Sequence, residues 1–377
     1  MDRNQKVLQG RGSLKKLPDM MGKLNIRNPL IVGGSNLTGK LMRRVPVLLT
    51  SPVFSEYHPN PDLADALAGA EMYRKHECDG IISIGGGSAI DTAKAVKALL
   101  YVNDLKEAQQ NCLPDGMTAP HIAIPGTAGT GAEATQNAVV YADGNKASLS
   151  HPDLRPDGAV LDPELLESLP EYHKKACALD ALAQGIESYW CTASTDDSKV
   201  HAYLAIKGVL DNLKDYLDGD IHAADEMLYA AYQSGKAIQI TRTTAAHAMS
   251  YRLTMKYGIA HGHAVMITLP VLWDMAAEHG EMSDILKEIA GIMRLGDPVM
   301  VPRLLRGITE DLGMKLPETP AENVLDELTD AVDPERLGNH PVAMSRTDIR
   351  EAYRRAMTPL CPAEKQACLD IWVYYNR

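Results

Sequence analysis

Two segments of the chain carry side chains that could bind one divalent metal ion. Asp180 and Gln184 stand four residues apart in ALDALAQGIESYW, so a helix would place them on one face. His247 lies in the helical run TTAAHAMSYRLTMKYG, and His261 follows the break at Gly258. One carboxylate and two imidazoles suit Zn²⁺ or Fe²⁺ and leave positions for water or a substrate oxygen. A catalytic metal site is therefore predicted, although single Asp and His residues on amphipathic helices are more often solvated or hydrogen-bonded.

A glycine-rich turn upstream offers the chemistry that a nucleotide needs. In IGGGSAIDTAKA, Gly85, Gly86 and Gly87 follow a predicted strand, and a helix is expected to open at Ser88. Bare backbone N–H groups at the positive end of that helix favour a pyrophosphate. Asp91 falls in the first turn of the same helix. The alternative is a tight turn that only lets the strand and the helix pack together.

A second turn of the same kind lies in PGTAGTGAEAT. It contains Gly126, Thr127, Gly129 and Thr130, which offer exposed amides and hydroxyl groups. Two anion-binding turns at the carboxyl ends of strands are typical of the crevice where open α/β sheets bind nucleotides.

The order of apolar runs and helical periods predicts the elements that position these turns. The expected strands are NPLIVGG, VPVLLTSPVF, DGIISIGG and the start of HIAIPGTAGTG, and helical periods follow the second and third of them. This alternation predicts a parallel, Rossmann-like α/β sheet with helices on both faces. From Pro163 onward, long amphipathic segments replace the strands. We expect a dinucleotide-binding α/β domain over residues 1–161 and an all-helical metal and substrate domain over residues 162–377.

Composition limits the classes of function. The chain has 377 residues, of which 45% are hydrophobic and 23% charged, which fits a globular protein with two domains. A formal charge of -11 argues against a nucleic-acid surface, so a small-molecule partner is expected. No apolar run approaches the roughly 20 residues of a membrane span, and nothing at the start resembles an export signal. The cysteines form no C-x-x-C pair, and we expect reduced thiols in a cytoplasmic protein.

Five motifs occur in a fixed order, namely GGGSAIDTAKA, GTAGTGAEAT, HPDLRPDGAVLDPELLESLP, DALAQGIESYW, and HAMSY with AHGHA. In wording and order they resemble the iron-containing (group III) alcohol dehydrogenase family over nearly the whole chain. The resemblance implies a dinucleotide-binding domain and an all-helical domain that holds Fe²⁺ or Zn²⁺ through one Asp and three His. By position, Asp180, His247 and His261 match three of those ligands. Gln184 stands where the family usually has His, and a homodimer is a family expectation.

The glutamine changes what is expected of the metal site. A Gln carbonyl oxygen is a weaker donor than imidazole, so Gln184 is expected to lower metal affinity and shift metal preference. Three outcomes remain open: Gln184 coordinates through oxygen, the site keeps three protein ligands plus water, or the metal is lost. His263 could be recruited instead, but a position in the pocket or beside the ligands fits the family better.

The resemblance also implies hydride transfer between a nicotinamide and a carbonyl carbon. A metal held by Asp180, His247 and His261 would polarise the aldehyde oxygen as a Lewis acid. Tyr251 occupies a position where several relatives carry a second His near the substrate. Tyr251 and His263 are the candidate catalytic residues, with pocket lining favoured over proton donation for Tyr251. A phenol with an ordinary pKa of about 10 is a poor acid at neutral pH.

Either NADP(H) or NAD(H) is expected as the cofactor, with NADP(H) favoured. Where members that prefer NAD often carry an Asp, this chain has Gly33, Gly34 and Ser35, so no carboxylate repels a 2′-phosphate. Lys40, Arg43 and Arg44 follow, although they could instead form a solvated helix face. The candidate cofactor-binding residues are Gly34, Ser35, Gly85, Gly86, Gly87, Ser88, Asp91, Gly126, Thr127, Thr130, Lys146 and Leu165.

Cations near the metal segments predict an anionic substrate. Arg242, Arg252 and Lys256 lie in and before the Tyr251 segment and would suit a phosphonate, phosphate or carboxylate tail. Capping of helices or exposure to water is the alternative for these residues. The wording TTAAHAMSYRLT and HGHAV is most similar to the branch of the family that reduces phosphonoacetaldehyde to 2-hydroxyethylphosphonate.

Other functions remain open at this stage. A generic short-chain alcohol or aldehyde dehydrogenase carries the same motifs and needs only a neutral pocket. A lyase similar to dehydroquinate synthase shares the two-domain plan and uses NAD transiently, but DALAQGIESYW and HAMSY favour the dehydrogenases. A nucleotide-binding relative without catalysis is suggested by Gln184 alone.

Overall fold

The computed structural model describes residues 5–58, 61–102, 105–142 and 145–376 and divides the chain into two compact units. The first unit comprises Met1–Pro170 and Lys214–Gln239, and the second comprises Glu171–Leu213 and Ile240–Arg377. The first therefore continues past the expected boundary at residue 161. The carboxylate of Asp162 explains part of this, because it accepts the backbone N–H groups of Gly12 at 3.2 Å and Leu14 at 3.0 Å.

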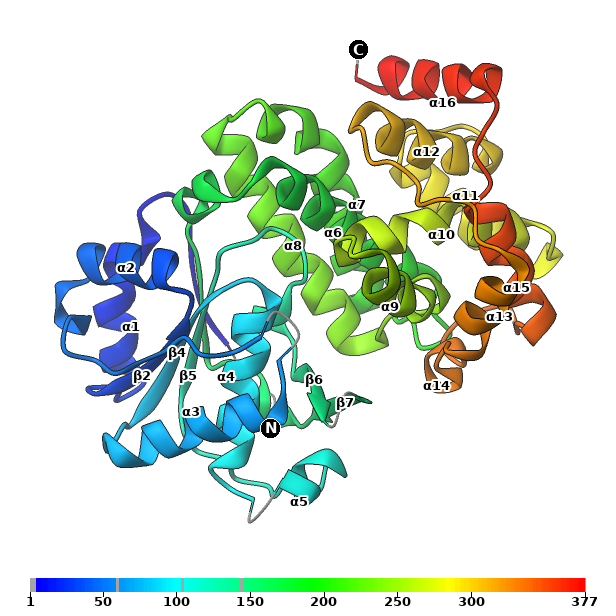
Figure 1. Ribbon diagram of the computed structural model, residues 1–377. Coiled ribbons are helices and arrows are strands. Elements are labelled where there is room, and N and C mark those ends of the chain that lie inside the picture. Colours follow the sequence, from blue (N-terminus) through cyan, green and yellow to red (C-terminus); the bar gives the residue numbers. More distant parts are fainter. Residues whose placement is uncertain (1–4, 59–60, 103–104, 143–144, 377) are drawn as a thin grey trace. The chain divides into compact units, whose positions relative to one another are not determined.

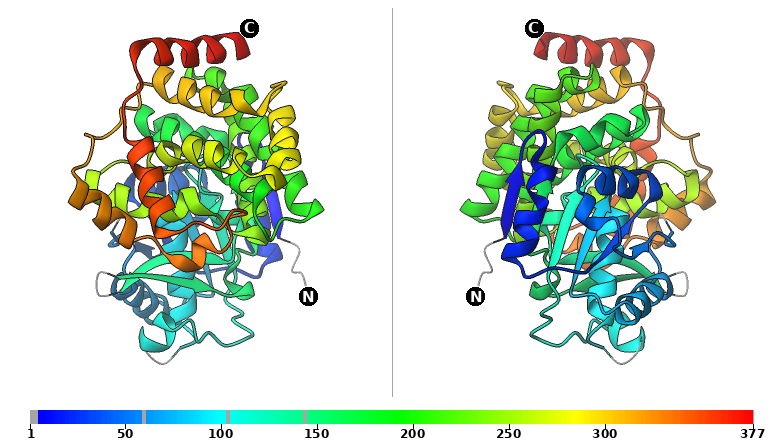
Figure 2. Two further views of the ribbon diagram at one scale, coloured as in Figure 1. Left: turned by 90° about the vertical axis from the view of Figure 1, so that its right-hand side faces the viewer. Right: turned by 90° about the vertical axis from the view of Figure 1, so that its left-hand side faces the viewer.

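A six-stranded parallel sheet forms the centre of the first unit (Figure 1). Its order is β1 (Lys6–Gln9), β8 (Gly158–Leu161), β5 (His121–Pro125), β4 (Gly80–Gly85), β2 (Pro29–Gly33) and β3 (Val53–Phe54). Strands β2, β4, β5 and β8 are buried along their whole length, as a sheet covered on both faces requires. β1, dark blue in Figure 2, lies at one edge.

Helices cover both faces of this sheet, which confirms the predicted fold class. Leu30 and Val32 of β2 face one core with α3 (Leu63–Lys75) and α4 (Gly87–Leu99). Ile31, between them in β2, faces the other core with α1 (Leu17–Lys23) and α2 (Ser35–Arg44). Alternation along the strand thus sends neighbouring side chains into two separate apolar layers.

The strand prediction needs two corrections, one in the segment VPVLLTSPVF and one for strands that were not predicted. Pro46–Leu48 forms a 3₁₀ turn, and only Val53–Phe54 pairs as a strand, because Pro46 and Pro52 lack N–H donors and fix the backbone φ. The structure also contains β1, β8 and an antiparallel hairpin of β6 (Asn137–Ala142) and β7 (Asn145–Ser150), none of which the apolar pattern indicated.

The described residues of the second unit form helices and turns without strands. Its helices are α6 (Glu171–Trp190), most of α7 (Asp196–Leu217), the end of α8 (Ile221–Thr241), α9 (Ala245–Tyr257), α10 (His261–Ala277), α11 (Ser283–Ile292), α12 (Val301–Asp311), α13 (Glu322–Asp330), α14 (Pro334–Leu337), α15 (Arg346–Ala356) and α16 (Pro362–Tyr375). Within the described part of the chain, no helix has the length and apolar character that a membrane span needs.

Two glycines bring α9 and α10 to the positions that the site requires. Gly258 ends α9 in the left-handed conformation, at φ 64°, which lets the chain turn directly into α10. A Cβ atom on Gly262 would lie 2.0 Å from the carbonyl oxygen of Ala176 and 2.7 Å from the Cβ of Asp180. Only glycine allows this approach, which places the start of α10 against the middle of α6.

Candidate active site

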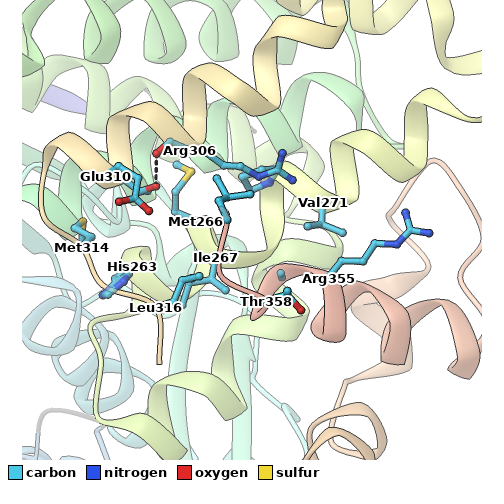
Figure 3. Close-up of a pocket in the computed structure, with 14 residues that line it drawn as sticks. His263, Met266, Ile267, Val271, Arg306, Glu310, Met314, Leu316, Arg355 and Thr358 are labelled. Carbon is cyan, nitrogen blue, oxygen red and sulfur yellow. Dashed lines mark hydrogen bonds between the residues drawn. The ribbon is translucent and has the colours of Figure 1, made fainter. Parts of the chain in front are cut away.

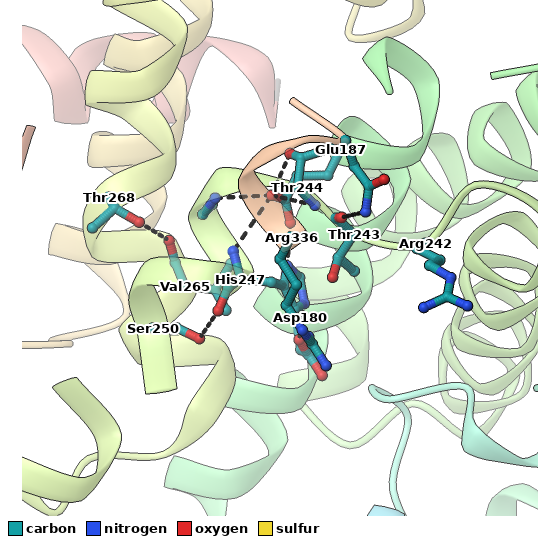
Figure 4. Close-up of polar contacts among 12 residues, drawn as sticks. Asp180, Glu187, Arg242, Thr243, Thr244, His247, Ser250, Val265, Thr268 and Arg336 are labelled. Atoms are coloured by element: carbon teal, nitrogen blue, oxygen red, sulfur yellow. Dashed lines mark hydrogen bonds and ion pairs between the residues drawn. The ribbon is translucent and has the colours of Figure 1, made fainter. Parts of the chain in front are cut away.

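Three helices of the second unit bring Asp180, His247 and His261 together. One potential ligand atom of each residue lies within 4.8 Å of those of the other two. Asp180 of α6 and His247 of α9 are each 3% exposed, and His261 at the start of α10 is partly buried. The arrangement around Asp180 and His247 is drawn in Figure 4. A buried carboxylate beside two imidazoles is a donor set that fits Zn²⁺ or Fe²⁺.

A buried carboxylate that the sequence analysis missed fixes the orientation of His247. Nδ1 of His247 is hydrogen-bonded to Glu187, while Nε2 lies 3.2 Å from Oδ1 of Asp180. Since a carboxylate accepts, Nδ1 must carry a proton, which leaves Nε2 as the metal-binding nitrogen. Glu187 lies seven residues after Asp180, two helical turns along the same face of α6, and that spacing could have revealed it.

The N-terminus of α9 holds Glu187 in turn. Its Oε1 accepts the hydroxyl proton of Thr244 at 2.6 Å and the backbone N–H of Ala246 at 2.9 Å. A carboxylate at a helix N-terminus also meets the positive end of the helix dipole. Glu187 is fully buried, so these donors and His247 replace the water that its charge has lost.

The charges of this group shift one another's ionisation. Burial disfavours the charged ring of His247, but Glu187 and Asp180 outweigh that effect and raise its pKa to about 9. Burial also opposes the ionisation of Asp180, yet hydrogen bonds from His247 and Gln184 and the charge of His261 hold its pKa below the ordinary value. In the metal-free protein, therefore, a proton occupies the place of the cation.

Gln184 lies within this group, as its spacing from Asp180 predicts. Its side chain is 4% exposed and hydrogen-bonds to the Asp180 carboxylate. The amide therefore lies where the family's third histidine is expected. Whether its oxygen binds a metal stays a prediction.

Tyr251 contacts His261, and an arginine that the sequence analysis did not single out contacts Tyr251. The rings of Tyr251 and His261 stack with centroids 5.2 Å apart. Arg336, from α14, lies 4.8 Å over the Tyr251 ring and donates a hydrogen bond to its hydroxyl group. No local signal in the sequence links Arg336 to Tyr251, since 85 residues separate them.

Two of the cations predicted to bind substrate pair with an acidic residue of α13. Arg252 donates to Glu327 at 2.6 Å and 3.1 Å, and Lys256 donates to the same carboxylate at 2.8 Å. The structure thus joins both residues to α13 through Glu327. Arg242 is exposed and has a positive φ of 65° in the turn before α9.

His263 lies away from the metal-binding group. It follows His261 by two residues and so points to the opposite side of α10. Its Nδ1 lies 3.0 Å from the hydroxyl of Tyr172, and its ring lines a cavity of about 70 Å³ with Met266, Ile267 and residues of α12 and α15 (Figure 3). Burial holds the pKa of His263 below its ordinary value, and the Lys315 carbonyl acts in the opposite direction. Its catalytic role stays a prediction.

The two glycine-rich turns lie side by side in the first unit. Gly126 donates its backbone N–H to the carbonyl of Gly85 at 2.8 Å. A Cβ on Gly86 would lie 3.3 Å from a methyl carbon of Thr127, and one on Gly87 would lie 3.0 Å from that of Thr130. The turns therefore pack together at the carboxyl ends of β4 and β5, where Ser88 continues α4.

The remaining predicted cofactor residues differ in their surroundings. Gly34 and Ser35 open α2 and are exposed, so a ligand could reach them. Asp91 accepts the backbone N–H of Val139 at 3.0 Å and lies 3.7 Å from the buried Lys94 ammonium, which ties α4 to β6. Leu165 is 1% exposed within the apolar core, and the side chain of Lys146 lies outside the described residues.

Comparisons with known proteins agree with this arrangement. The model of the family described as iron-containing alcohol dehydrogenase matches residues 4–163, and that of its C-terminal domain matches residues 175–357. A phosphonoacetaldehyde reductase of Streptomyces viridochromogenes is 37% identical over 242 residues, which are 60% of this chain and 61% of that protein. An alcohol dehydrogenase of Thermococcus barophilus is 31% identical over 75% of this chain and 78% of its own length.

Solved structures show the same architecture. A sulfoacetaldehyde reductase from Bifidobacterium kashiwanohense, solved in complex with NAD⁺, aligns with a TM-score of 0.87 and 26% sequence identity. The alignment covers 94% of this chain and 97% of that one.

Proposed function

This chain belongs to the iron-containing alcohol dehydrogenase family, and from that membership we propose that it reduces phosphonoacetaldehyde to 2-hydroxyethylphosphonate. Members of the family are oxidoreductases that interconvert alcohols and aldehydes with NAD(P) and a divalent metal. The identity of the aldehyde is the part that we propose.

The relative with 37% identity carries this proposal. It is a phosphonoacetaldehyde reductase, although the matched region spans only 61% of its length. The similar solved structure is a sulfoacetaldehyde reductase. Both names describe a two-carbon aldehyde with an acidic group, so a short anionic aldehyde is the substrate class that they share.

The residues of the chain have separate tasks in this reaction. Asp180, His247 and His261 would hold the metal, with Gln184 beside them and Glu187 holding His247 in the tautomer that leaves Nε2 available. When bound, the metal supplies Lewis-acid polarisation of the carbonyl, and the reduced nicotinamide supplies the hydride. Backbone N–H groups at Gly86 and Gly87, at the start of α4, would bind the pyrophosphate of the cofactor.

NADP(H) is the cofactor that we favour. Gly34 and Ser35 open α2 without a carboxylate, and Lys40 and Arg43 follow on the same helix. Arg44 is less available, because it pairs with Glu164 at 2.8 Å.

A dehydrogenase of short neutral alcohols is the second candidate. The alcohol dehydrogenase of Thermococcus barophilus supports it, since it matches a larger share of this chain than the phosphonoacetaldehyde reductase does.

An assay of the metal-reconstituted protein tests these alternatives. Phosphonoacetaldehyde and propanal are each reduced with NADPH and with NADH, and Asp180→Ala serves as the control without a complete metal site. We expect the highest kcat/KM for phosphonoacetaldehyde with NADPH and loss of turnover in the variant. A higher kcat/KM for propanal would support the second candidate, and full activity without metal would contradict both.

A further inference from the structure

Arg336 is a cation placed beside the metal-binding group by a well-anchored segment. The segment, residues 334–340, contacts the site at several points. Asn339 accepts the backbone N–H of Thr192 at 3.1 Å and donates through its side chain to the carbonyl of Thr243 at 3.2 Å. His340 is 5% exposed and packs edge-on against Trp190. These contacts hold α14, and with it Arg336, in place over Tyr251.

The guanidinium of Arg336 retains hydrogen-bonding capacity. It donates to the Tyr251 hydroxyl, and its Nε lies 3.9 Å from a carboxylate oxygen of Asp333, too far for a close ion pair. Among the described residues, these are the polar contacts recorded for it. Its side chain is 22% exposed, so a small solute can reach it. An arginine has N–H groups in a planar fork that matches the oxygens of a phosphonate or carboxylate.

The cations of α9, Arg252 and Lys256, are already paired with a carboxylate. Glu327 accepts from Arg252 and Lys256 within 3.1 Å, so both positive charges have a near partner. An incoming anion would have to compete with that carboxylate. Within the described part of the chain, the carboxylate that pairs with Arg336 is that of Asp333, at 3.9 Å, and the guanidinium lies over the Tyr251 ring, which stacks on His261.

We propose that Arg336 binds the anionic group of the substrate and gives the enzyme its preference for a charged over a neutral short aldehyde. This inference rests on the proposed function, since it requires that the aldehyde carbonyl lie at the Asp180, His247 and His261 group. A two-carbon substrate is short, so its charged end must lie close to that group. Arg336 contacts Tyr251, which stacks on His261, whereas Arg252 and Lys256 pair with Glu327 of α13.

Kinetics of charge-removing variants test the inference. Arg336→Gln, Arg336→Lys and the matched control Arg252→Gln are compared with the wild type on phosphonoacetaldehyde and propanal. Loss of a hydrogen-bonded charge at Arg336 should lower kcat/KM for phosphonoacetaldehyde roughly 10- to 100-fold, mainly through KM. For propanal, the change in Arg336→Gln should stay within about threefold. Arg336→Lys should be intermediate, and Arg252→Gln should leave the ratio of the two substrates unchanged.

A binding measurement separates this inference from the proposed function. Ethylphosphonate is titrated calorimetrically into metal-loaded full-length protein saturated with oxidised cofactor. Weaker binding to Arg336→Gln than to Arg252→Gln supports the inference even if no aldehyde is turned over. Equal ethylphosphonate affinity in the wild type and Arg336→Gln overturns it. So does an equal loss with both aldehydes, which would assign Arg336 only to holding Tyr251.

Discussion

Glu187 and His247 form a buried acid and base pair behind the metal-binding group. The carboxylate accepts from the ring, from Thr244 and from the first turn of α9, so its position is set on several sides. Partners of this kind orient a metal-binding imidazole and raise its basicity. The metal affinity should therefore depend on Glu187, although Glu187 does not face the metal.

Replacement of Glu187 by Gln tests this dependence. The amide keeps the shape of the side chain but removes the charge, so we expect metal affinity to fall about 10- to 100-fold. Competition with a chelator measures the affinity. Glu288→Gln, which removes an exposed carboxylate on α11, is the control and should change nothing. Unchanged affinity in Glu187→Gln would contradict the assigned role.

Gln184 sets a second expectation for metal affinity. An imidazole is a stronger donor than an amide oxygen, so Gln184→His should tighten the binding of Zn²⁺ by about tenfold or more. The same chelator competition measures it, with Gln233→His on α8 as a control that adds a histidine outside the set Asp180, Gln184, His247 and His261. Equal affinity in Gln184→His and wild type would show that position 184 takes no part in binding.

The raised pKa of His247 predicts how metal affinity varies with pH. Because its pKa is about 9 in the folded metal-free protein, a metal must displace a proton below that pH. Apparent affinity should rise about tenfold per pH unit up to pH 9 and level off above it. The charged ring also stabilises the metal-free fold fully below its unfolded pKa, and this contribution is lost as pH rises through about 9. Affinity that is constant between pH 7 and 9 would contradict the shift.

At the scale of elements, glycines decide how closely helices and turns approach. Gly262 lets α10 contact α6 at Asp180. A Cβ on Gly131, which has a φ of 59°, would lie 2.5 Å from the Cα of Gly235 in α8. Gly34 differs, because its φ is -69° and no atom lies within 4 Å of the place of its Cβ. A side chain is therefore tolerated there.

Gly34→Asp exploits this space at the start of α2. An Asp at the N-cap in place of Gly should stabilise the helix by only about 0.3 kcal/mol, measured as a rise in the free energy of unfolding. Its charge should also lower kcat/KM for NADPH by about tenfold while sparing NADH, since it repels the 2′-phosphate. Gly34→Ala adds the Cβ without the charge and controls for space. Equal effects on both cofactors would contradict the placement of the ribose at α2.

At the scale of the whole molecule, the residues proposed to bind the cofactor and those proposed to bind the metal belong to different compact units. The glycine-rich turns and α2 lie in the first unit, and the metal-binding group, Glu187 and Arg336 lie in the second. Each unit has its own buried residues around its own site. Each ligand should therefore stabilise mainly the unit whose residues bind it.

Hydrogen exchange of the backbone amides can test this division. Addition of Zn²⁺ should slow exchange in peptides from α6, α9 and α10, because these helices carry the proposed ligands Asp180, His247 and His261. Addition of NADP⁺ without metal should instead slow exchange around Gly85–Gly87 and the start of α2. The His247→Ala variant should lose the first effect and keep the second. Equal protection of both units by Zn²⁺ would contradict the assignment.

Local sequence patterns determined the fold class, the glycine-rich turns and the shared helix face of Asp180 and Gln184, while the family resemblance implied that His247 and His261 join them. Helical periods, strand runs and turn glycines act over a few residues, so they can be identified without the rest of the chain. The strand predicted for VPVLLTSPVF was wrong over most of its length. Its apolar run favoured a strand, but its prolines lack the N–H donors that strand pairing needs.

Only the tertiary structure determined which charges reach the site. Glu187 lies behind His247, Arg336 lies over Tyr251, and Glu327 holds Arg252, yet these pairs are separated by 60, 85 and 75 residues. Similarly, β1 pairs with β8 across most of the first unit. Such partners are selected by packing between distant segments, where burial and hydrogen bonding depend on three-dimensional position. Local periodicity therefore cannot predict which distant residues will pair.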